Sequence, residues 1–163
     1  MPHVVSIVYT PASVPDLRPG ERYARVSAGR VRLVEGHGIE GDAKGGPGRR
    51  QVNLMAAETL EELSAEGFKT GPGEMGEQIV VAGIDPRTVA VGTRVRVGGA
   101  VVEVTLPRTG CSRFEHIQGK PKRSVTGRLG VLVRVVSGGE VAVGDEVRVV
   151  EPACRAGLGE PAP

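Results

Sequence analysis

The pattern of apolar and polar positions divides the chain into short extended segments that are separated by turn residues. Branched apolar residues, valine above all, alternate with polar ones or fill runs of five to seven positions, and glycine or proline bounds most of these runs. Runs of this kind are typical of β-strands. Gly98 and Gly99 separate two of them, as in a two-residue β-hairpin. The predicted strands cover 4–8, 30–34, 51–55, 93–97, 100–106, 131–136 and 146–150.

One segment, 57–66, has helical periodicity instead. Leu60 and Leu63 share one face, Glu58 lies in the first turn, where the helix dipole favours a negative charge, and Gly67 supplies a C-terminal stop. Many short strands with one clear short helix predict a mainly β fold, a mostly antiparallel β-barrel whose core is packed by valine and whose loops supply the functional residues.

A short internal similarity supports the barrel. The Val-Ala-Val-Gly turn and alternating strand at 89–97 recur at 141–149. Two copies are too few for a repeat protein, so they predict two similar turn-and-strand units within one barrel.

Length and composition fit one globular domain. The chain has 163 residues, of which 39% are apolar and 25% charged. We predict a single domain over 1–151 and a disordered tail over 152–163, where proline, glycine and alanine dominate. Two distant cysteines, no apolar run near eighteen residues and no leader pattern at Met1 predict a soluble cytoplasmic protein without a membrane partner.

Charge is segregated although the net charge is only +2. The segment 57–66 is acidic, whereas 107–134 contains Glu115 alone among many basic residues, which predicts one acidic and one cationic face. A nucleic-acid-binding barrel is one interpretation of the basic segment. Single-strand binders present several stacking rings, however, and Phe114 is the only aromatic residue there, so a nucleic-acid partner is not expected. The basic residues are Arg108, Arg113, Lys120, Lys122, Arg123, Arg128 and Arg134.

Cys111 is the strongest candidate for chemistry. It follows the predicted strand 100–106 and lies between Arg108 and Arg113. A thiolate is a soft metal ligand and a nucleophile, and nearby cations favour the charged form. The alternative is an inert, partly buried small residue. His116 is the one neighbour near zinc-ligand spacing, and it and His37 are possible catalytic partners, although nothing in the spacing favours either.

Anion binding is the second candidate function. The glycine-rich segment 36–48 lacks the Gly-Lys-Ser/Thr of a phosphate-binding P-loop and the context of a dinucleotide fold. Arg49, Arg50 and Arg128 remain, since guanidinium groups hold phosphate or pterin acceptors through forked hydrogen bonds. The alternative is that these arginines are simply solvated.

Separated motifs follow one another in order over 31–149. They are Gly-x-x-Gly-Asp at 38–43, Arg-Gln-Val at 49–52, a Gly-Glu-Asn-Ile-like element at 71–79, a cysteine at Cys111, Arg-x-Gly-Val at 128–131, and closing Gly-Gly and Gly-Asp-x-Val elements at 138–139 and 143–147. This series resembles the MOSC domain, the C-terminal domain of molybdenum cofactor sulfurases, which also occurs as free-standing bacterial proteins and whose hallmark cysteine corresponds to Cys111. Lys44, Asn53, Gln78 and Gly110 depart from the family pattern.

The resemblance implies a compact barrel related to the pyruvate-kinase β-barrel domain, and a molybdenum cofactor, molybdopterin-Mo. It makes Cys111 the molybdenum ligand. It places Arg50 and Arg128, with Arg49 and Arg108, at the phosphate and pterin. The remaining positions that it implies for cofactor binding are Asp42, Gln51, Asn53, Glu77 and Gln78.

Two functions follow from the resemblance. The first is an oxidoreductase that reduces N-hydroxylated bases or related small molecules with electrons from a separate donor protein. The second is a sulfur carrier or adaptor in which Cys111 bears a persulfide and no turnover occurs. The chain has no pyridoxal-phosphate domain, so its sulfur would come from a partner cysteine desulfurase.

Overall fold

A computed structural model describes residues 1–12 and 25–152. The predicted tail beyond Pro152, with Cys154, lies outside the described residues. The described part forms eleven strands, two α-helices and two short 3-10 helices. Their bounds are β1 (His3–Tyr9), β2 (Val26–Ala28), β3 (Arg30–Val34), β4 (Gly38–Ile39), β5 (Val52–Ala56), α1 (Ala57–Ala65), β6 (Ile79–Ala82), η1 (Pro86–Thr88), β7 (Arg94–Val97), β8 (Ala100–Pro107), α2 (Ser112–Gln118), η2 (Lys122–Val125), β9 (Val131–Ser137), β10 (Gly139–Ala142) and β11 (Val147–Glu151).

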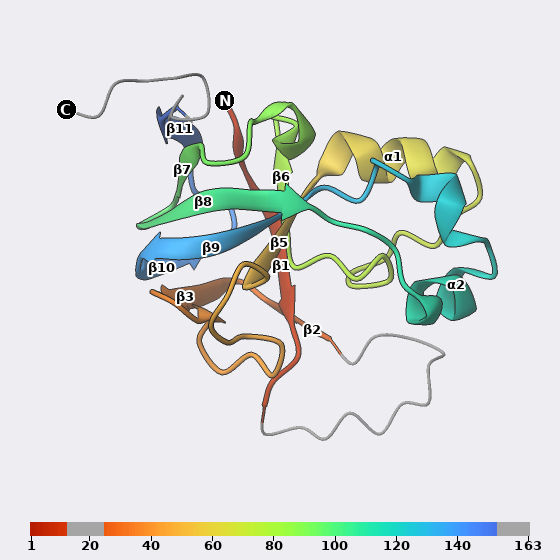
Figure 1. Ribbon diagram of the computed structural model, residues 1–163, viewed down its shortest axis with the longest axis horizontal. Helices are drawn as coiled ribbons and strands as arrows, with labels where there is room; N and C mark the ends of the chain where they lie inside the picture. Colours follow the sequence, from red (N-terminus) through yellow and green to blue (C-terminus); the bar gives the residue numbers. More distant parts are fainter. Residues whose placement is uncertain (13–24, 153–163) are drawn as a thin grey trace.

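Two sheets make up the body of the protein (Figure 1). The larger has the strand order β11-β7-β8-β9-β5-β6-β1-β2, and the smaller has the order β10-β3-β4. Among the described strands only β5 and β6 run parallel, because α1 carries the chain from the end of one back to the start of the other. All five residues of β5 are buried, since β5 lies inside the sheet, with β9 on one side and β6 on the other.

The mainly β class is confirmed, but the sheets are not closed into a continuous barrel. Where closure would occur, the described residues form an isolated bridge between His3 and Glu146 rather than a ladder. The amide of Val4 also donates to the carbonyl of Asp145 at 2.9 Å. The turn before β11 therefore rests against the start of β1, and the large sheet curls without a full set of closing hydrogen bonds.

The two similar turn-and-strand units are confirmed, and they are neighbours. They become β7 and β11, which pair antiparallel with Val97 opposite Val147 and Val95 opposite Val149. Valine from both strands enters the main core between the sheets.

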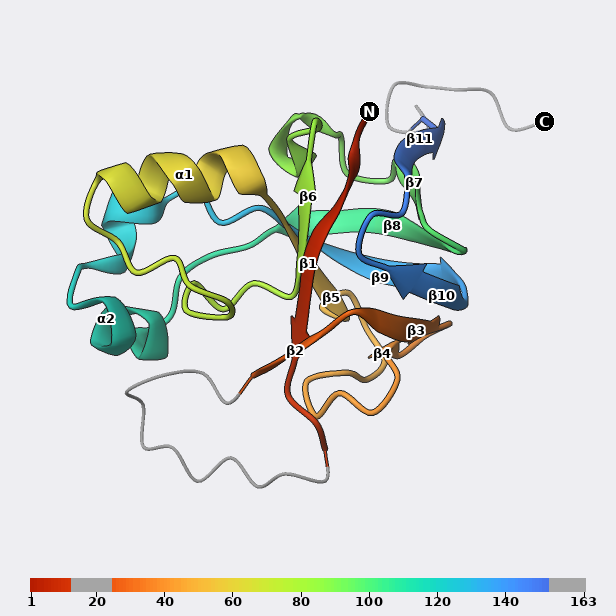
Figure 2. The same cartoon turned by 180° about the vertical axis from the view of Figure 1, so that it is seen from behind.

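A second, smaller core lies where the helices pack. Figures 1 and 2 show α1 and α2 on the same side of the molecule, away from β10 and β11. This second core joins both helices to the large sheet through Met55, Leu63, Phe68, Met75, Phe114, Val125 and Leu129.

The sequence pattern did not predict α2, β2, β4, β6 or β10. Among the described side chains of α2, the apolar ones that are buried are Phe114 and Ile117, too few to produce a helical period by themselves. Its clearest signal is Gly119, which ends the helix in the left-handed conformation with φ 67°. The strands β2 and β4 have three and two residues, shorter than any window in which alternation can be recognised.

Gly130 lies very close to the backbone of the neighbouring strand β5. It has φ +74°, and a Cβ placed on it would come within 2.0 Å of the carbonyl oxygen of Leu54 in β5. Gly127 has nearly the same φ, +75°, but a Cβ there would meet nothing within 4 Å. Gly130→Ala should therefore lower the free energy of unfolding by about 4 kcal/mol or more, and Gly127→Ala by about 1 to 2 kcal/mol.

Urea unfolding of both variants measures the difference directly. Because the two glycines share a backbone conformation, the excess loss in Gly130→Ala reports the approach to β5. Equal losses in the two variants would contradict that close approach.

Candidate functional site

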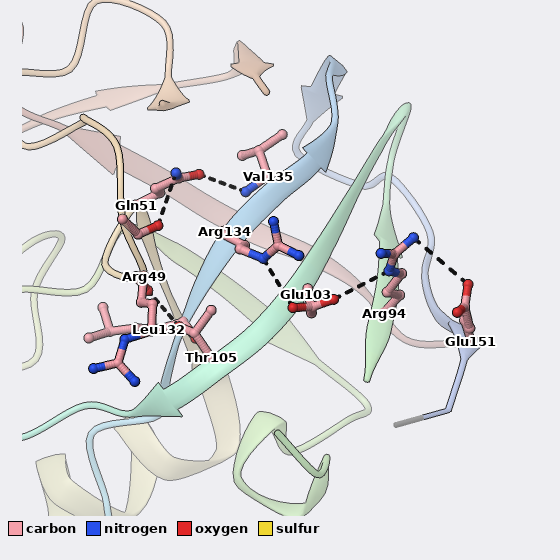
Figure 3. A network of polar contacts seen from close by, with 10 residues as sticks. Arg49, Gln51, Arg94, Glu103, Thr105, Leu132, Arg134, Val135 and Glu151 are labelled. Carbon is pink, nitrogen blue, oxygen red and sulfur yellow. Dashed lines mark hydrogen bonds and ion pairs between the residues drawn. The ribbon is translucent and has the colours of Figure 1, made fainter. Parts of the chain in front are cut away.

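The C-terminal end of β8 is the point where distant parts of the chain meet. The amide of Arg108 donates to the carbonyl of Gly130 at 3.0 Å, and its Nη1 donates to the carbonyl of Met75 at 2.8 Å. Two residues before the end of β8, the Thr105 hydroxyl binds the carbonyls of Arg49, at 2.5 Å, and Leu132, at 2.9 Å (Figure 3). The end of β8 thereby fixes the chain at Arg49, at Met75 and at Gly130.

Cys111 follows this junction and is exposed. It is the N-cap of α2, with an extended backbone (φ −135°, ψ 176°), and its carbonyl accepts from the amide of Glu115 at 3.1 Å. Phe114, one turn along, is fully buried in the second core and anchors the helix. Cys111 is thus held at the surface by a packed element, so it is not the partly buried residue of the alternative interpretation, while its chemical role stays a prediction.

Three predicted cofactor residues form one buried chain of hydrogen bonds. The Gln78 Nε2 donates to Oδ2 of Asp42 at 2.7 Å, and its Oε1 accepts from the amide of Asn53 at 3.0 Å. The Asn53 Nδ2 donates to the carbonyls of Leu129 and Val131, each at 3.2 Å. Gly130 lies between Leu129 and Val131, and its own carbonyl accepts from the backbone amide of Arg108.

Asp42 secures the other end of the buried chain. Its Oδ1 accepts from the backbone amides of Thr10 and Lys44, both at 3.2 Å. The side chains of Asp42, Asn53 and Gln78 are therefore engaged with protein groups and hold the glycine-rich loop, β5 and the turn before β9 together. For these residues a direct contact with a cofactor stays a prediction.

Glu77 shapes the neighbouring loop. Its buried carboxylate accepts from the amides of Gly73 at 2.7 Å and Met75 at 3.1 Å. Burial raises the pKa of Glu77, and the hydrogen bonds from the backbone oppose that rise. By folding the loop back on itself, Glu77 presents the Met75 carbonyl to Arg108.

Gln118 has a similar role, and the sequence analysis missed it. It is buried at the end of α2. Its Oε1 accepts from the amide of Lys69 at 2.8 Å, and its Nε2 donates to the carbonyls of Lys69 and Glu74 at 2.9 and 3.0 Å. Gln118 therefore ties the helix that begins at Cys111 to the loop that Glu77 shapes. A lone glutamine before a helix-ending glycine gave no signal of this in the sequence.

Gln51 fixes the segment that contains the predicted arginines. Its Oε1 accepts from the amide of Val135 at 2.8 Å, and its Nε2 donates to the carbonyl of Gly48 at 3.1 Å (Figure 3). The side chains of Arg49 and Arg50 are exposed, and Figure 3 shows the Arg49 guanidinium pointing away from Gln51. The backbone here is held firmly while the guanidinium groups face outward.

Arg128 is turned toward α1. Its two terminal nitrogens bind both carboxylate oxygens of Glu66, at 2.8 and 2.5 Å. The paired guanidinium lowers the pKa of the Glu66 carboxyl. The predicted contact of Arg128 with phosphate would have to replace or share this partner, and it stays a prediction.

The histidines are not drawn into the site by the contacts that the structure describes. The ring of His37 packs against Gly45, where an added Cβ would come within 2.5 Å of Nε2. His116 lies exposed in the last turn of α2. Within residues 1–12 and 25–152, no group of three or more His, Cys, Asp or Glu side chains is placed to hold a metal ion, and no helix is long and apolar enough to cross a membrane.

The raised pKa of Glu77 predicts how the stability of the protein changes with pH. The folded protein keeps the Glu77 proton to a higher pH than the unfolded chain does, so rising pH favours the unfolded state. Relative to Glu77→Gln, wild type should lose stability as the pH rises from about 4 through the raised pKa, and the difference should then level off. Urea unfolding of both proteins between about pH 4 and pH 8 measures it. A difference that is flat or that grows in favour of wild type would contradict the effect of burial.

Solved structures of low sequence identity share this fold. The chain is similar to YiiM from Geobacillus stearothermophilus, with a TM-score of 0.72 and 21% identity over 93% of this chain and 76% of that one. It is similar to YiiM from Escherichia coli, with a TM-score of 0.66 and 21% identity over 94% of this chain and 71% of that one. The YuaD protein from Bacillus subtilis gives a TM-score of 0.71 and 21% identity over 93% of this chain and 97% of that one.

Sequence comparison identifies the family. We find no curated protein sequence that matches the chain. The model of the MOSC domain, however, matches residues 37–148, well over half of the chain. The matched region contains Cys111, the junction at the end of β8 and the buried hydrogen bonds that run from Asp42 to the carbonyls beside Gly130. This protein belongs to the MOSC domain family.

Proposed function

We propose that this protein binds the molybdenum cofactor and reduces N-hydroxylated bases or related small molecules, with Cys111 as the molybdenum ligand. The observation that supports this proposal is the position of Cys111. The family's hallmark cysteine is exposed at the start of a helix that Phe114 and Gln118 hold in place.

The residues present fit such a cofactor chemically. A thiolate is a suitable ligand for a soft, high-valent metal, and an exposed thiol is accessible to one. Guanidinium groups bind phosphate through paired hydrogen bonds. Arg49 and Arg50 are exposed on a backbone that is fixed next to the end of β8, and Arg108 lies at that end. Arg49, Arg50 and Arg108 would hold the phosphate and pterin, and Cys111 would hold the metal.

The proposed reaction is a two-electron reduction. The N–O bond of the N-hydroxyl group breaks, two electrons arrive from a reduced donor protein, and two protons from water complete the amine and a molecule of water. When bound, the cofactor supplies the two-electron redox chemistry. The protein itself would bind and orient the group. Cys111 would hold the metal at the surface, and the buried contacts of Gln78, Glu77 and Gln118 keep the surrounding segments in place.

A second candidate function rests on the exposure of the same thiol. A surface cysteine on a fixed helix start is accessible to a partner cysteine desulfurase and suits a sulfur carrier that bears a persulfide. Treatment with a desulfurase and cysteine should then add one sulfur atom to Cys111, as measured by mass spectrometry, and purified protein should reduce no hydroxylamine.

Metal content tests the first proposal. Wild type and Cys111→Ser are purified from a host that makes the cofactor, and molybdenum is measured by mass spectrometry. Loss of a contact that only supports a metal ligand lowers metal affinity about 10- to 100-fold. Loss of the ligand itself should cost at least as much, so we expect the substitution to lower bound molybdenum at least 10-fold.

Cys154→Ser is the matched control, since it removes the other thiol. It should leave bound molybdenum unchanged, and thermal unfolding should show that all three proteins are folded. Equal molybdenum in wild type and Cys111→Ser would remove Cys111 as the ligand. Reduction of a hydroxylamine by the loaded wild type with a chemical electron donor would favour the reductase over the sulfur carrier.

A further inference from the structure

The basic segment 107–134 does not contribute its charge evenly to the surface. Arg128 is paired with Glu66, and Arg134 is paired with Glu103 at 3.0 Å on the outer face of the large sheet (Figure 3). Each of these arginines has a carboxylate partner, although Glu103 also pairs with Arg94. Their pairing leaves a smaller group of cations near α2 to set the local potential.

This group, which we call the α2 cationic surface, comprises Lys69, Lys120, Lys122 and Arg123. Lys122 and Arg123 are exposed at the start of η2, and Lys69 is exposed on the loop that Gln118 ties to α2. The ammonium group of Lys120 lies 5.3 Å from the centre of the Phe68 ring. Lys120 follows the end of α2, Lys122 and Arg123 belong to η2, and Lys69 lies on the loop that Gln118 ties to α2, so all four cations come from segments next to the end of α2.

The nearby carboxylates only partly offset this charge. Glu115 accepts from the amide of Lys122 at 2.8 Å, and Glu74 accepts from the amide of Gly71 at 2.9 Å. Both carboxylates face backbone amides, so four cations stand against two engaged anions. The other acidic residues of this region gather on α1, where Glu66 already holds Arg128.

The α2 cationic surface directly adjoins the candidate site. A Cβ placed on Gly110 would come within 2.9 Å of the Cβ of Lys122, so the residue before Cys111 packs on the first residue of η2. A partner bound to these cations would lie against the exposed thiol. This proximity distinguishes the surface from the scattered charges on the sheets.

The chemistry of the surface favours an acidic protein over a nucleic acid. Single-strand binders stack bases on exposed aromatic rings. Here Phe114 is 0% exposed and Phe68 is 8% exposed, so both rings belong to the second core. A spread of lysine and arginine side chains without rings suits electrostatic steering of an acidic partner, which raises the rate of encounter and depends on salt.

We propose that the α2 cationic surface docks an acidic redox protein, which delivers electrons to the group held at Cys111. This inference rests on the proposed reductase function and names the partner of the same site. The donor supplies the two electrons of the N–O cleavage and leaves oxidised. The lysines and arginine orient it so that its redox group faces the thiol end of α2.

Charge reversal tests the docking independently of turnover. A fluorescently labelled flavodoxin serves as the acidic probe, and binding is measured by anisotropy at about 20 mM salt. Lys122→Glu combined with Arg123→Glu should weaken binding at least 10-fold. Raising the salt to about 200 mM should weaken binding to wild type, because the screening length then falls below 10 Å.

The matched control combines Arg30→Glu with Arg148→Glu, which changes the net charge by the same amount. These residues belong to β3 and β11, away from α2 (Figure 1), and each loses only an exposed ion pair. The control should bind the flavodoxin within about twofold of wild type, as expected when exposed rim charges contribute little. Thermal unfolding should show both variants folded.

Each outcome decides the proposal. Equal weakening in both double variants would show a response to net charge alone and would overturn the docking surface, as would wild type that binds no flavodoxin. Tighter binding of a single-stranded oligonucleotide than of the flavodoxin would also overturn it. The binding assay needs no bound metal. Selective loss of binding therefore supports the surface even if the molybdenum measurement fails, and equal molybdenum in wild type and Cys111→Ser contradicts the proposed function alone.

Discussion

The hydrogen bonds of the buried Gln78 side chain join parts of the protein that are far apart in the sequence. Gln78 donates to Asp42 in the glycine-rich loop and accepts from Asn53 in β5. Asn53 in turn binds the carbonyls on both sides of Gly130, and Gly130 accepts from Arg108 beyond the end of β8. Because a buried polar group without a partner costs about 1 to 3 kcal/mol, removing any member exposes its neighbours to that cost. These buried hydrogen bonds therefore fix the segment that leads to Cys111.

Much of the fold follows from local pattern. Valine-rich segments became strands wherever they exceeded about four residues, as in β1, β8 and β9, because alternation over that length is enough to define a buried face. The similar units at 89–97 and 141–149 became neighbouring strands. By contrast, α2 depends on a core that it shares with α1, so the partners of Phe114 are known only from the folded structure. The incomplete closure of the sheet depends on how the turn before β11 meets His3, which no local pattern encodes.

The candidate site, like the fold, could be predicted from the sequence only in part. Cys111 could be singled out from the sequence because it follows a predicted strand and lies between two arginines. The structure places it at the surface, and its role stays a prediction. The pairing of Arg128 with Glu66 and the contacts of Gln118 could not, since each joins residues at least 44 positions apart. Segregated charge was visible in the sequence. Which cations remain for a partner became clear only when the ion pairs were known, and one of those that remain, Lys122, packs against Gly110, the residue before Cys111.

The most direct measurement is site-resolved hydrogen exchange in Gln78→Met, which keeps the approximate volume and removes the amide group. If the buried chain fixes the end of β8, the amide of Arg108, bound to Gly130, should exchange at least 10-fold faster than in wild type, as expected for a local loss of about 1.4 kcal/mol or more. The backbone amides that pair β7 with β11 take no part in this hydrogen-bond network, and their exchange rates should change far less. An unchanged Arg108 amide, or an equal change in both places, would contradict the positioning of the candidate site by this network.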